Sequence, residues 1–296
     1  MKGHTIKEWL LVTRPWSFPA SAMPVIVTIT YLWSQEYEIS WSLGIMALVN
    51  IILVHAAGNV WSDYFDYRKG VDAVDTYGVR ILTDKQFTPK EVLTLSLILQ
   101  VLAVGMGLTM VWLTGITLLW FGLAGIALSL FYPPLKYAAL GDLVIMACYA
   151  LLPMLGTTFI CTGNIVPDVL WLAVPVGSIT VAILHVNNAR DIETDRRAGI
   201  HTFALLTGRP FAINVYLFEI ILPYCWLLGT VLLGFVSLWA LVAVITLPLA
   251  IGNCRQMLSC RTEGITAIAR LDEATAKLQL AFSLTLSVGL IIEALT

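Results

Sequence analysis

The stretch NVWSDYFDYRKGVD, residues 59–72, places three aspartates directly behind a long apolar run. The residues before it, SLGIMALVNIILVHAAG, contain no Asp, Glu, Lys or Arg. Such a run predicts a helix that crosses a bilayer, because about 20 apolar residues in a helix span the hydrocarbon core. Charged side chains close to a membrane are costly unless they are paired or serve a function. This stretch therefore predicts both a membrane helix and a candidate site at its end.

The composition of all 296 residues supports the same fold class, with 58% hydrophobic and only 12% charged residues. Soluble domains carry roughly 25% charged residues, and the mean hydropathy here is +0.85. The apolar runs are continuous rather than alternating, so a membrane β-barrel is disfavoured and we predict an all-α membrane protein. We expect a single transmembrane domain, 1–296, with nine spans. The spans are predicted at 16–34, 42–62, 91–112, 115–132, 141–161, 168–188, 209–230, 233–252 and 276–295.

The positive charges are segregated along the chain. All 17 Lys and Arg residues fall in the N-terminal segment, in every second connection, or at the edge of the following span. The other connections, such as SQEYEIS and TGNIVPD, contain none. The positive-inside rule predicts a multi-pass protein of the cytoplasmic (inner) membrane whose N-terminus and charged loops face the cytoplasm. The net charge of −2 gives no indication of nucleic-acid binding, and no obligate protein partner is evident.

A second acidic motif, NNARDIETDRRA at residues 187–198, follows the sixth predicted span. Both motifs begin N-x-x-x-D and carry another Asp about one turn later. The first contains Asn59, Asp63 and Asp66, and the second contains Asn187, Asp191 and Asp195. Residues at this spacing share one face of a helix, so each motif predicts a stripe of oxygen ligands.

Carboxylates stacked on one face repel one another unless a cation lies between them. Mg²⁺ takes oxygen ligands and binds through one or two carboxylates together with substrate phosphates. Two such stripes on the same side of the membrane would suit a diphosphate held by Mg²⁺. The simpler alternative is an acidic helix end whose aspartates pair with nearby Arg and Lys.

The motifs DYFDYRKGVD and NNARDIETDRRAG resemble the two aspartate-rich motifs of the UbiA superfamily of intramembrane prenyltransferases. Within it they look closest to the 1,4-dihydroxy-2-naphthoate polyprenyltransferases of the menaquinone pathway. The resemblance covers the whole chain and implies nine helices around a central cavity, capped on the cytoplasmic side by charged loops. It implies prenyl transfer from a polyprenyl diphosphate to an aromatic acceptor. For the naphthoate this transfer is accompanied by decarboxylation and leads to demethylmenaquinone.

The resemblance also implies roles for individual residues. The Mg²⁺ ligands are then Asp63, Asp66, Asp191 and Asp195. Lys136, Arg80 and Arg197 neutralise the leaving diphosphate, and Tyr132 lies near the reacting allylic carbon. The residues expected to bind substrates are Asn59, Asn187, Asn188, Asp72, Arg190 and His55. Two departures from the family pattern are Ser62 before the first Asp, and Ile200 and His201 after Gly199.

Other residues leave alternatives open. Pro133 and Pro134 are expected to interrupt the helix between Tyr132 and Lys136. His55 and His185 could be hydrogen-bonded packing residues or could touch the acceptor. Glu219 falls inside the seventh predicted span, where a carboxylate needs a partner or a proton.

Three other kinds of protein compete with this interpretation. A cation-coupled transporter also uses membrane carboxylates, but usually near the bilayer midplane, whereas most acids here gather at one face. A phosphotransferase acting on lipid alcohols would show a D-G-x-x-A-R signature, which the sequence lacks. A scaffold with a vestigial site would not need four intact aspartates. Within the prenyltransferases, 4-hydroxybenzoate is the alternative acceptor.

Overall fold

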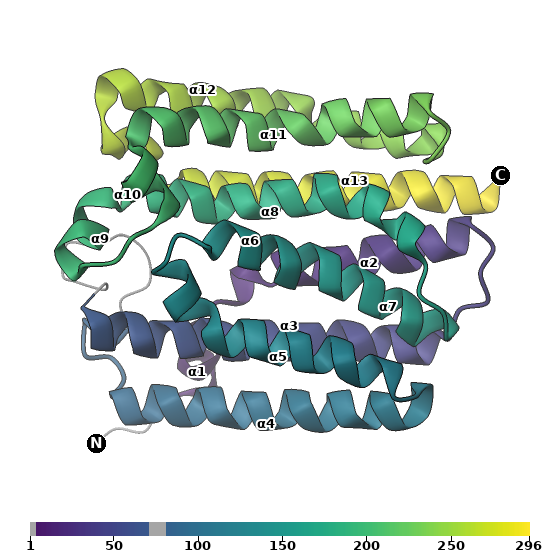
Figure 1. The fold of residues 1–296 in the computed structure, drawn as a ribbon, viewed down its shortest axis with the longest axis horizontal. Helices are drawn as coiled ribbons and strands as arrows, with labels where there is room; N and C mark the ends of the chain where they lie inside the picture. The colour runs from purple at the N-terminus through teal and green to yellow at the C-terminus, as the bar shows by residue number, and fades with distance from the viewer. Residues whose placement is uncertain (1–3, 71–80) are drawn as a thin grey trace.

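The computed structural model describes residues 4–70 and 81–296 of the chain. Its regular elements are all helices (Figure 1). The α-helices are α1 (Ile6–Val12), α2 (Pro19–Ser34), α3 (Trp41–Lys69), α4 (Pro89–Thr114), α5 (Thr117–Lys136), α6 (Gly141–Met146), α7 (Leu152–Thr162), α8 (Leu170–Arg190), α9 (Ile192–Ala198), α10 (Phe203–Thr207), α11 (Arg209–Leu232), α12 (Leu247–Glu263) and α13 (Leu271–Leu295). A π-helical turn, Ala147–Leu151, joins α6 to α7, and a 3₁₀ segment, Leu238–Thr246, leads into α12.

The predicted membrane fold is confirmed, with one difference in the number of spans. Within the described residues, eight helical stretches are long and apolar enough to cross a membrane. The first predicted span corresponds to α2, which has 16 residues and begins at Pro19. It is shorter than the others because Arg14 and Pro15 divert the chain before it, with Arg14 in the left-handed region at φ 56°.

The long helices run along one common axis (Figure 1). In that view α11 and α12 lie above α8 and α13, and α3, α5 and α4 lie below, with α2, α6 and α7 between them. One end carries α9, α10 and the turn between α12 and α13, whereas the C-terminus lies at the opposite end. The C-terminal end of α3, which bears the first acidic motif, therefore lies at the same end as the second motif.

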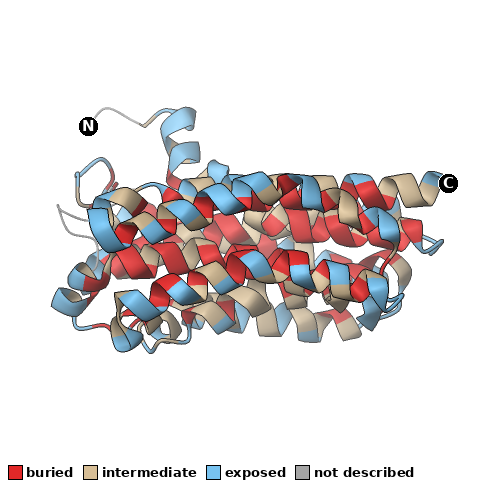
Figure 2. Ribbon diagram, turned by 90° about the horizontal axis from the view of Figure 1, so that it is seen from above, coloured by how far each residue is buried: buried red, intermediate tan, exposed pale blue. Residues whose placement is uncertain are grey.

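Buried residues line the inward faces of the helices (Figure 2). α8 is the most enclosed of the candidate spans, with 72% of its apolar window buried. In contrast, α4 and α5 expose large apolar side chains such as Trp112 and Trp120, which are 83% and 68% exposed. Such faces suit lipid, which is as apolar as a protein core. α8 thus holds the second motif on a well-packed support, whereas α4 and α5 form an outer wall.

The expected break at Pro133 and Pro134 is wrong, because α5 continues through both prolines to Lys136. A proline removes an amide donor and leaves the carbonyl four residues earlier without its helical partner. Here the Leu130 carbonyl accepts from Trp61 Nε1 at 3.4 Å, so α3 supplies a donor for the freed group. Neighbouring helices commonly compensate for prolines in this way in membrane proteins.

The single helical stripe expected for the second motif is also interrupted. α8 ends at Arg190, and Asp191 joins it to α9 with φ −94° and ψ 14°. Hydrogen bonds nevertheless link Asp191 N to Asn187 O and Asp195 N to Asp191 O, both at 2.9 Å. The spacing of the motif therefore survives, but a bend redirects its last turn.

Candidate active site

α3 carries the first acidic motif on one continuous face. The helix extends to Lys69 and ends at Gly70, whose φ of 76° provides the left-handed cap that glycine adopts without strain. Asp66 is 8% exposed. It accepts a hydrogen bond from the Tyr137 hydroxyl at 2.6 Å, and the Lys136 Nζ lies 3.3 Å from its Oδ2. The end of α5 is thereby held against the acidic face of α3.

The segment between α1 and α2 packs on the same face of α3. Arg14 forms an ion pair with Asp63, whose side chain is 4% exposed. Asn59 Nδ2 donates to the Thr13 carbonyl and to the Ser17 hydroxyl, each at 3.0 Å. Two residues of the motif therefore anchor this N-terminal segment.

The second motif is fixed by charge-assisted hydrogen bonds. Arg190 donates through Nε and Nη2 to the two oxygens of Asp191 at 2.9 and 3.0 Å, and through Nη1 to the Ala269 carbonyl at 3.2 Å. The Thr202 hydroxyl donates to Asp195 Oδ2 at 3.0 Å. Bidentate Arg–carboxylate pairs are geometrically specific, so Asp191 has a defined orientation relative to the start of α13.

One cavity of about 1230 Å³ receives both motifs. Its polar end is lined by Asn59 and Asp66 from α3, by Lys136, and by Asn187, Asp191 and Asp195 from the second motif. Its remaining walls are mainly apolar and include Val25, Ile51, Met110, Leu118, Phe121 and Ile160. The site therefore joins a charged end to a long apolar interior.

Asp195 lies outside the membrane spans, in α9. Burial raises the pKa of Asp195 to about 6; Lys136 and the hydrogen bond from Thr202 act in the opposite direction, whereas Asp191 and Asp66 raise it further. Lys136 and Asp66 thus act electrostatically on a residue of the second motif. The two acidic motifs are close enough to interact.

Four other predicted site residues also lie at the cavity. Tyr132, His55, Asn188 and Arg190 line the cavity. His55 also lies 2.8 Å from the Ser21 hydroxyl through Nδ1 and 3.3 Å from the Ser17 hydroxyl through Nε2. His55 is therefore a hydrogen-bonded packing residue that also forms part of the cavity wall.

Two predicted residues do not line the cavity, and two cannot be placed. Asp63 lies behind Arg14, and Arg197 is exposed on α9; neither is among the lining residues. Arg80 and Asp72 lie outside the described residues.

Several lining residues were not predicted from the sequence. Arg14 lines the cavity, as do Arg270 and Lys277 from the start of α13. The signal for Arg14 was an arginine at the start of an apolar run, which resembles an ordinary flanking charge. Tyr137, the partner of Asp66, directly follows Lys136, but nothing in the sequence distinguishes it from an interfacial tyrosine.

The ligands available at the polar end suit a hard cation. The carboxylates of Asp66, Asp191 and Asp195 and the amide of Asn187 all line it, and Asn187 Oδ1 is buried without a hydrogen-bond partner. Oxygen-only ligands with room for water and phosphate are what Mg²⁺ prefers. The residues present therefore fit Mg²⁺.

The sequence profile described as "UbiA prenyltransferase family" matches residues 21–271. The chain belongs to the UbiA prenyltransferase family. This UbiA-family protein is 32% identical to the Mus musculus "UbiA prenyltransferase domain-containing protein 1" over 297 residues, covering 98% of this chain and 85% of the relative. It is 34% identical to the Drosophila melanogaster homologue over 257 residues, covering 83% and 70%. The predicted superfamily is confirmed, and the menaquinone-type subfamily stays a prediction.

Solved structures show the same fold. The apo structure of a UbiA homologue from Aeropyrum pernix K1 matches with a TM-score of 0.71 at 16% identity, covering 93% of this chain and 97% of that one. A UbiA homologue from Archaeoglobus fulgidus, described as bound to DMAPP and Mg²⁺, matches with a TM-score of 0.59 at 12% identity, covering 95% and 99%. The helical arrangement of this UbiA-family protein is thus shared with distant homologues.

Proposed function

We propose that this UbiA-family protein transfers a polyprenyl group from a polyprenyl diphosphate to 1,4-dihydroxy-2-naphthoate. The observation that most directly supports a polyprenyl diphosphate donor is the cavity whose charged end receives both acidic motifs and whose interior is apolar. The choice of the naphthoate as acceptor rests on the resemblance of the two motifs to the menaquinone-pathway enzymes. A polyprenyl diphosphate has the same division, with a charged head and a hydrocarbon tail. The match with a homologue described as bound to DMAPP and Mg²⁺ agrees with this assignment.

The diphosphate would occupy the polar end. Asp66, Asp191 and Asp195 would hold Mg²⁺ there together with Asn187, while Asp63 supports the site through Arg14. When bound, Mg²⁺ would neutralise the negative charge that accumulates on the leaving diphosphate. Lys136, Arg14, Arg190, Arg270 and Lys277 also line the cavity and supply positive charge from the chain itself. Donors placed where charge develops commonly contribute several kcal/mol to rate enhancement.

Tyr132 and the apolar walls would position the prenyl group for reaction. Tyr132 lines the cavity one helical turn before Lys136 on α5, so its ring lies close to the cationic end and can face an allylic carbon attached to the diphosphate. The apolar walls on α2, α3, α4, α5 and α7 would hold the isoprenoid tail. They would also exclude water, which would otherwise capture an allylic cation.

The reaction balances without an external oxidant. The allylic C–O bond breaks and its electron pair leaves with the diphosphate. A ring carbon of the naphthoate supplies the electron pair for the new C–C bond. The attacked carbon loses its proton, which restores the aromatic ring. The carboxylate leaves as carbon dioxide and the electron pair of its bond takes up a proton, so the product is the quinol form of demethylmenaquinone.

The orientation that fits this proposal places the cap formed by α9, α10 and the α12–α13 turn in the cytoplasm. That end of the bundle carries the Lys- and Arg-rich connections that the positive-inside rule assigns to the cytoplasm. A water-soluble aromatic acid would then reach the polar end directly, while the prenyl diphosphate would reach it from the bilayer.

Turnover by the purified full chain in nanodiscs tests this proposal. Geranylgeranyl or farnesyl diphosphate and Mg²⁺ would be supplied with 1,4-dihydroxy-2-naphthoate or 4-hydroxybenzoate, with EDTA as a control. Mass spectrometry should show a prenylated naphthalene lacking the carboxyl group. Product from the benzoate alone would overturn the acceptor assignment and keep prenyl transfer. Failure to bind the diphosphate at all would favour the transporter alternative.

A further inference from the structure

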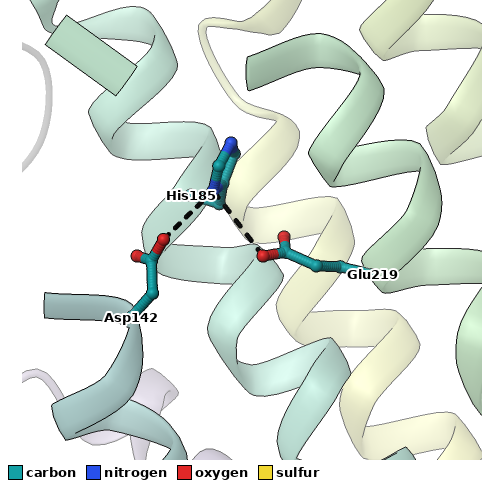
Figure 3. A group of neighbouring side chains, drawn as sticks. All are labelled: Asp142, His185 and Glu219. Carbon is teal, nitrogen blue, oxygen red and sulfur yellow. Dashed lines mark hydrogen bonds and ion pairs between the residues drawn. The ribbon is translucent and has the colours of Figure 1, made fainter. Parts of the chain in front are cut away.

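A second buried polar cluster lies outside the cavity described above, where α6, α8 and α11 meet (Figure 3). It consists of Asp142 at the start of α6, His185 on α8 and Glu219 on α11. His185 is fully buried and Glu219 is 8% exposed. None of the three lines the cavity that receives the acidic motifs, so their chemistry is not explained by the proposed transfer reaction.

The hydrogen bonds of His185 determine which ring nitrogen faces the carboxylates. Its Nε2 lies 3.0 Å from the Ala212 carbonyl, which can only accept, so Nε2 carries a hydrogen. Its Nδ1 points at Asp142 Oδ2, 3.4 Å away, and at Glu219 Oε1, 3.6 Å away. In a neutral imidazole with this tautomer, Nδ1 is an acceptor. Three acceptor atoms would then face one another, so either a proton or a metal ion is needed between them.

The distances distinguish a proton from a metal ion. Charge-assisted N–H···O bonds are about 2.7–2.9 Å long, so a proton on Nδ1 would be poorly bonded to either carboxylate. An ion bound about 2.0–2.1 Å from each ligand at tetrahedral angles keeps its ligand atoms about 3.3–3.4 Å apart. The two separations from His185 Nδ1, 3.4 and 3.6 Å, lie close to this value. All three ligand atoms lie within 4.8 Å of one another.

The remaining atoms of the cluster also lack a protein cation. Asp142 Oδ1 and Glu219 Oε2 are buried and have no hydrogen-bond partner. Among the described residues, no Lys or Arg forms an ion pair with either carboxylate. Two carboxylates with buried, unpartnered oxygens in a membrane protein are strongly destabilising unless something neutralises them.

The surrounding helices hold the cluster in place. The Ser178 hydroxyl on α8 donates to the Glu219 carbonyl on α11 at 2.8 Å. The ring of Phe203, from α10, lies 5.7 Å from the His185 ring. A histidine whose second ring nitrogen donates to a backbone carbonyl is typical of metal ligands, because that bond fixes the tautomer. The Asp142 side chain is 20% exposed, so the cluster is not fully enclosed.

We propose that Asp142, His185 and Glu219 bind a divalent transition-metal ion such as Zn²⁺. One imidazole nitrogen and two carboxylate oxygens suit Zn²⁺ better than Mg²⁺, which prefers oxygen ligands. Three protein ligands leave a fourth position for water. The ion would cross-link α6, α8 and α11 near the end of the bundle that carries the second acidic motif.

Metal content of the full-length protein, purified with a tag that contains no histidine, tests this proposal. After loading with Zn²⁺ and removal of excess, mass spectrometry should find about one ion per chain. The His185→Ala and Glu219→Gln variants should lose it. His201→Ala and Asp191→Asn should keep it, since the first removes an exposed histidine and the second a residue of the other site. Equal zinc content in His185→Ala and the unaltered protein would overturn the proposal, as would zinc absent after loading.

X-ray absorption at the zinc edge gives a measurement that does not depend on any variant folding. The unaltered protein should show one imidazole nitrogen with oxygen neighbours at about 2.0–2.1 Å. Sulfur at about 2.3 Å would indicate binding by cysteine and overturn the assignment. Neither measurement uses prenyl transfer, so failure of the proposed function would leave this test unaffected.

Discussion

Lys136 Nζ lies 3.3 Å from Asp66 Oδ2, and both side chains are largely buried, at 16% and 11% exposed. The pair joins the end of α5 to the first acidic motif on α3. A diphosphate and its cation arriving at this end would compete for both partners. Phosphate oxygens would bind the Lys136 ammonium, and the metal ion would bind the Asp66 carboxylate. The ion pair therefore neutralises and orients two groups that the proposed function assigns to binding of the diphosphate and its cation.

Replacing Lys136 by Met should lower kcat by about 100- to 1000-fold, because a cation that stabilises leaving-group charge is lost. Steady-state turnover at a saturating concentration of prenyl diphosphate would measure the change in kcat. Lys90→Met is the matched control, since Lys90 is exposed at the start of α4. A Lys136→Met enzyme with turnover within about twofold of the unaltered protein would exclude a role for this ammonium in departure of the diphosphate.

Asp191→Ala and Asp63→Ala should each abolish detectable turnover while leaving the protein folded in detergent. For Asp191 the reason is loss of a carboxylate that lines the polar end and is oriented by two hydrogen bonds from Arg190. For Asp63 the reason is loss of the partner that holds Arg14.

Glu193→Gln provides the control for Asp191, because Glu193 belongs to the same motif but pairs with Arg196 on the surface. Turnover and size-exclusion profiles would be compared across all three variants. Substantial activity in Asp191→Ala would contradict its assignment as a metal ligand.

Mg²⁺ affinity should fall as the pH drops below about 6. The pKa of Asp195 is raised to about 6, first by burial, so its carboxylate becomes protonated below that pH. At pH 5 about a tenth remains ionised, and competition by one proton should weaken Mg²⁺ binding about 10-fold relative to pH 8. Titrations of Mg²⁺ at these two pH values would measure the change, and Asp195→Asn should flatten it. An equally steep dependence in that variant would assign the proton to another group.

The same raised pKa predicts the sign of the stability change. The unfolded chain has the lower pKa, so between the two values the folded state binds more protons, and stability in the absence of metal falls as the pH rises from about 4 to 6. Thermal unfolding of the metal-free protein should show this fall in stability between about pH 4 and 6. Bound Mg²⁺ should abolish this pH dependence.

Much of the fold and part of the site could be predicted from local sequence. Apolar length and charge segregation defined the spans, because a membrane helix satisfies its own backbone. The spacing of Asn59, Asp63 and Asp66 placed them on one face because α3 is a continuous α-helix there. The bend at Asp191 was not predictable from spacing, since it depends on contacts of Arg190 with α13.

Long-range contacts account for what the sequence did not show. The carbonyl freed by Pro134 in α5, that of Leu130, accepts from Trp61, which is distant in sequence. The Asp142, His185 and Glu219 cluster draws one residue from each of three helices. Glu219 alone indicated that a partner was needed, but its partners have no sequence spacing that identifies them.

Arg14→Ala should lower stability by about 1–3 kcal/mol. It removes the cation that pairs with the buried Asp63 carboxylate. The penalty is below that of a fully buried pair because the Arg14 side chain is 30% exposed. Thermal unfolding in detergent would measure the loss. The control is Arg196→Ala, whose ion pair with Glu193 is 61% and 63% exposed and should contribute less than about 1 kcal/mol. Equal shifts in the two variants would show that the Arg14 pair is no stronger than a surface pair.

Gly289→Ala should destabilise the bundle by about 1–3 kcal/mol, because inserting a methyl group into a well-packed contact forces the backbone apart. A Cβ at Gly289 on α13 would overlap the carbonyl oxygen of Trp239, in the 3₁₀ segment before α12. That neighbour is backbone and cannot rotate away. Gly229→Ala is the matched control, since a Cβ there meets nothing within 4 Å. Reduced thermal stability should appear in the first variant and not in the second. A Gly289→Ala protein as stable as the control would show that this contact is loose enough to accommodate a methyl group.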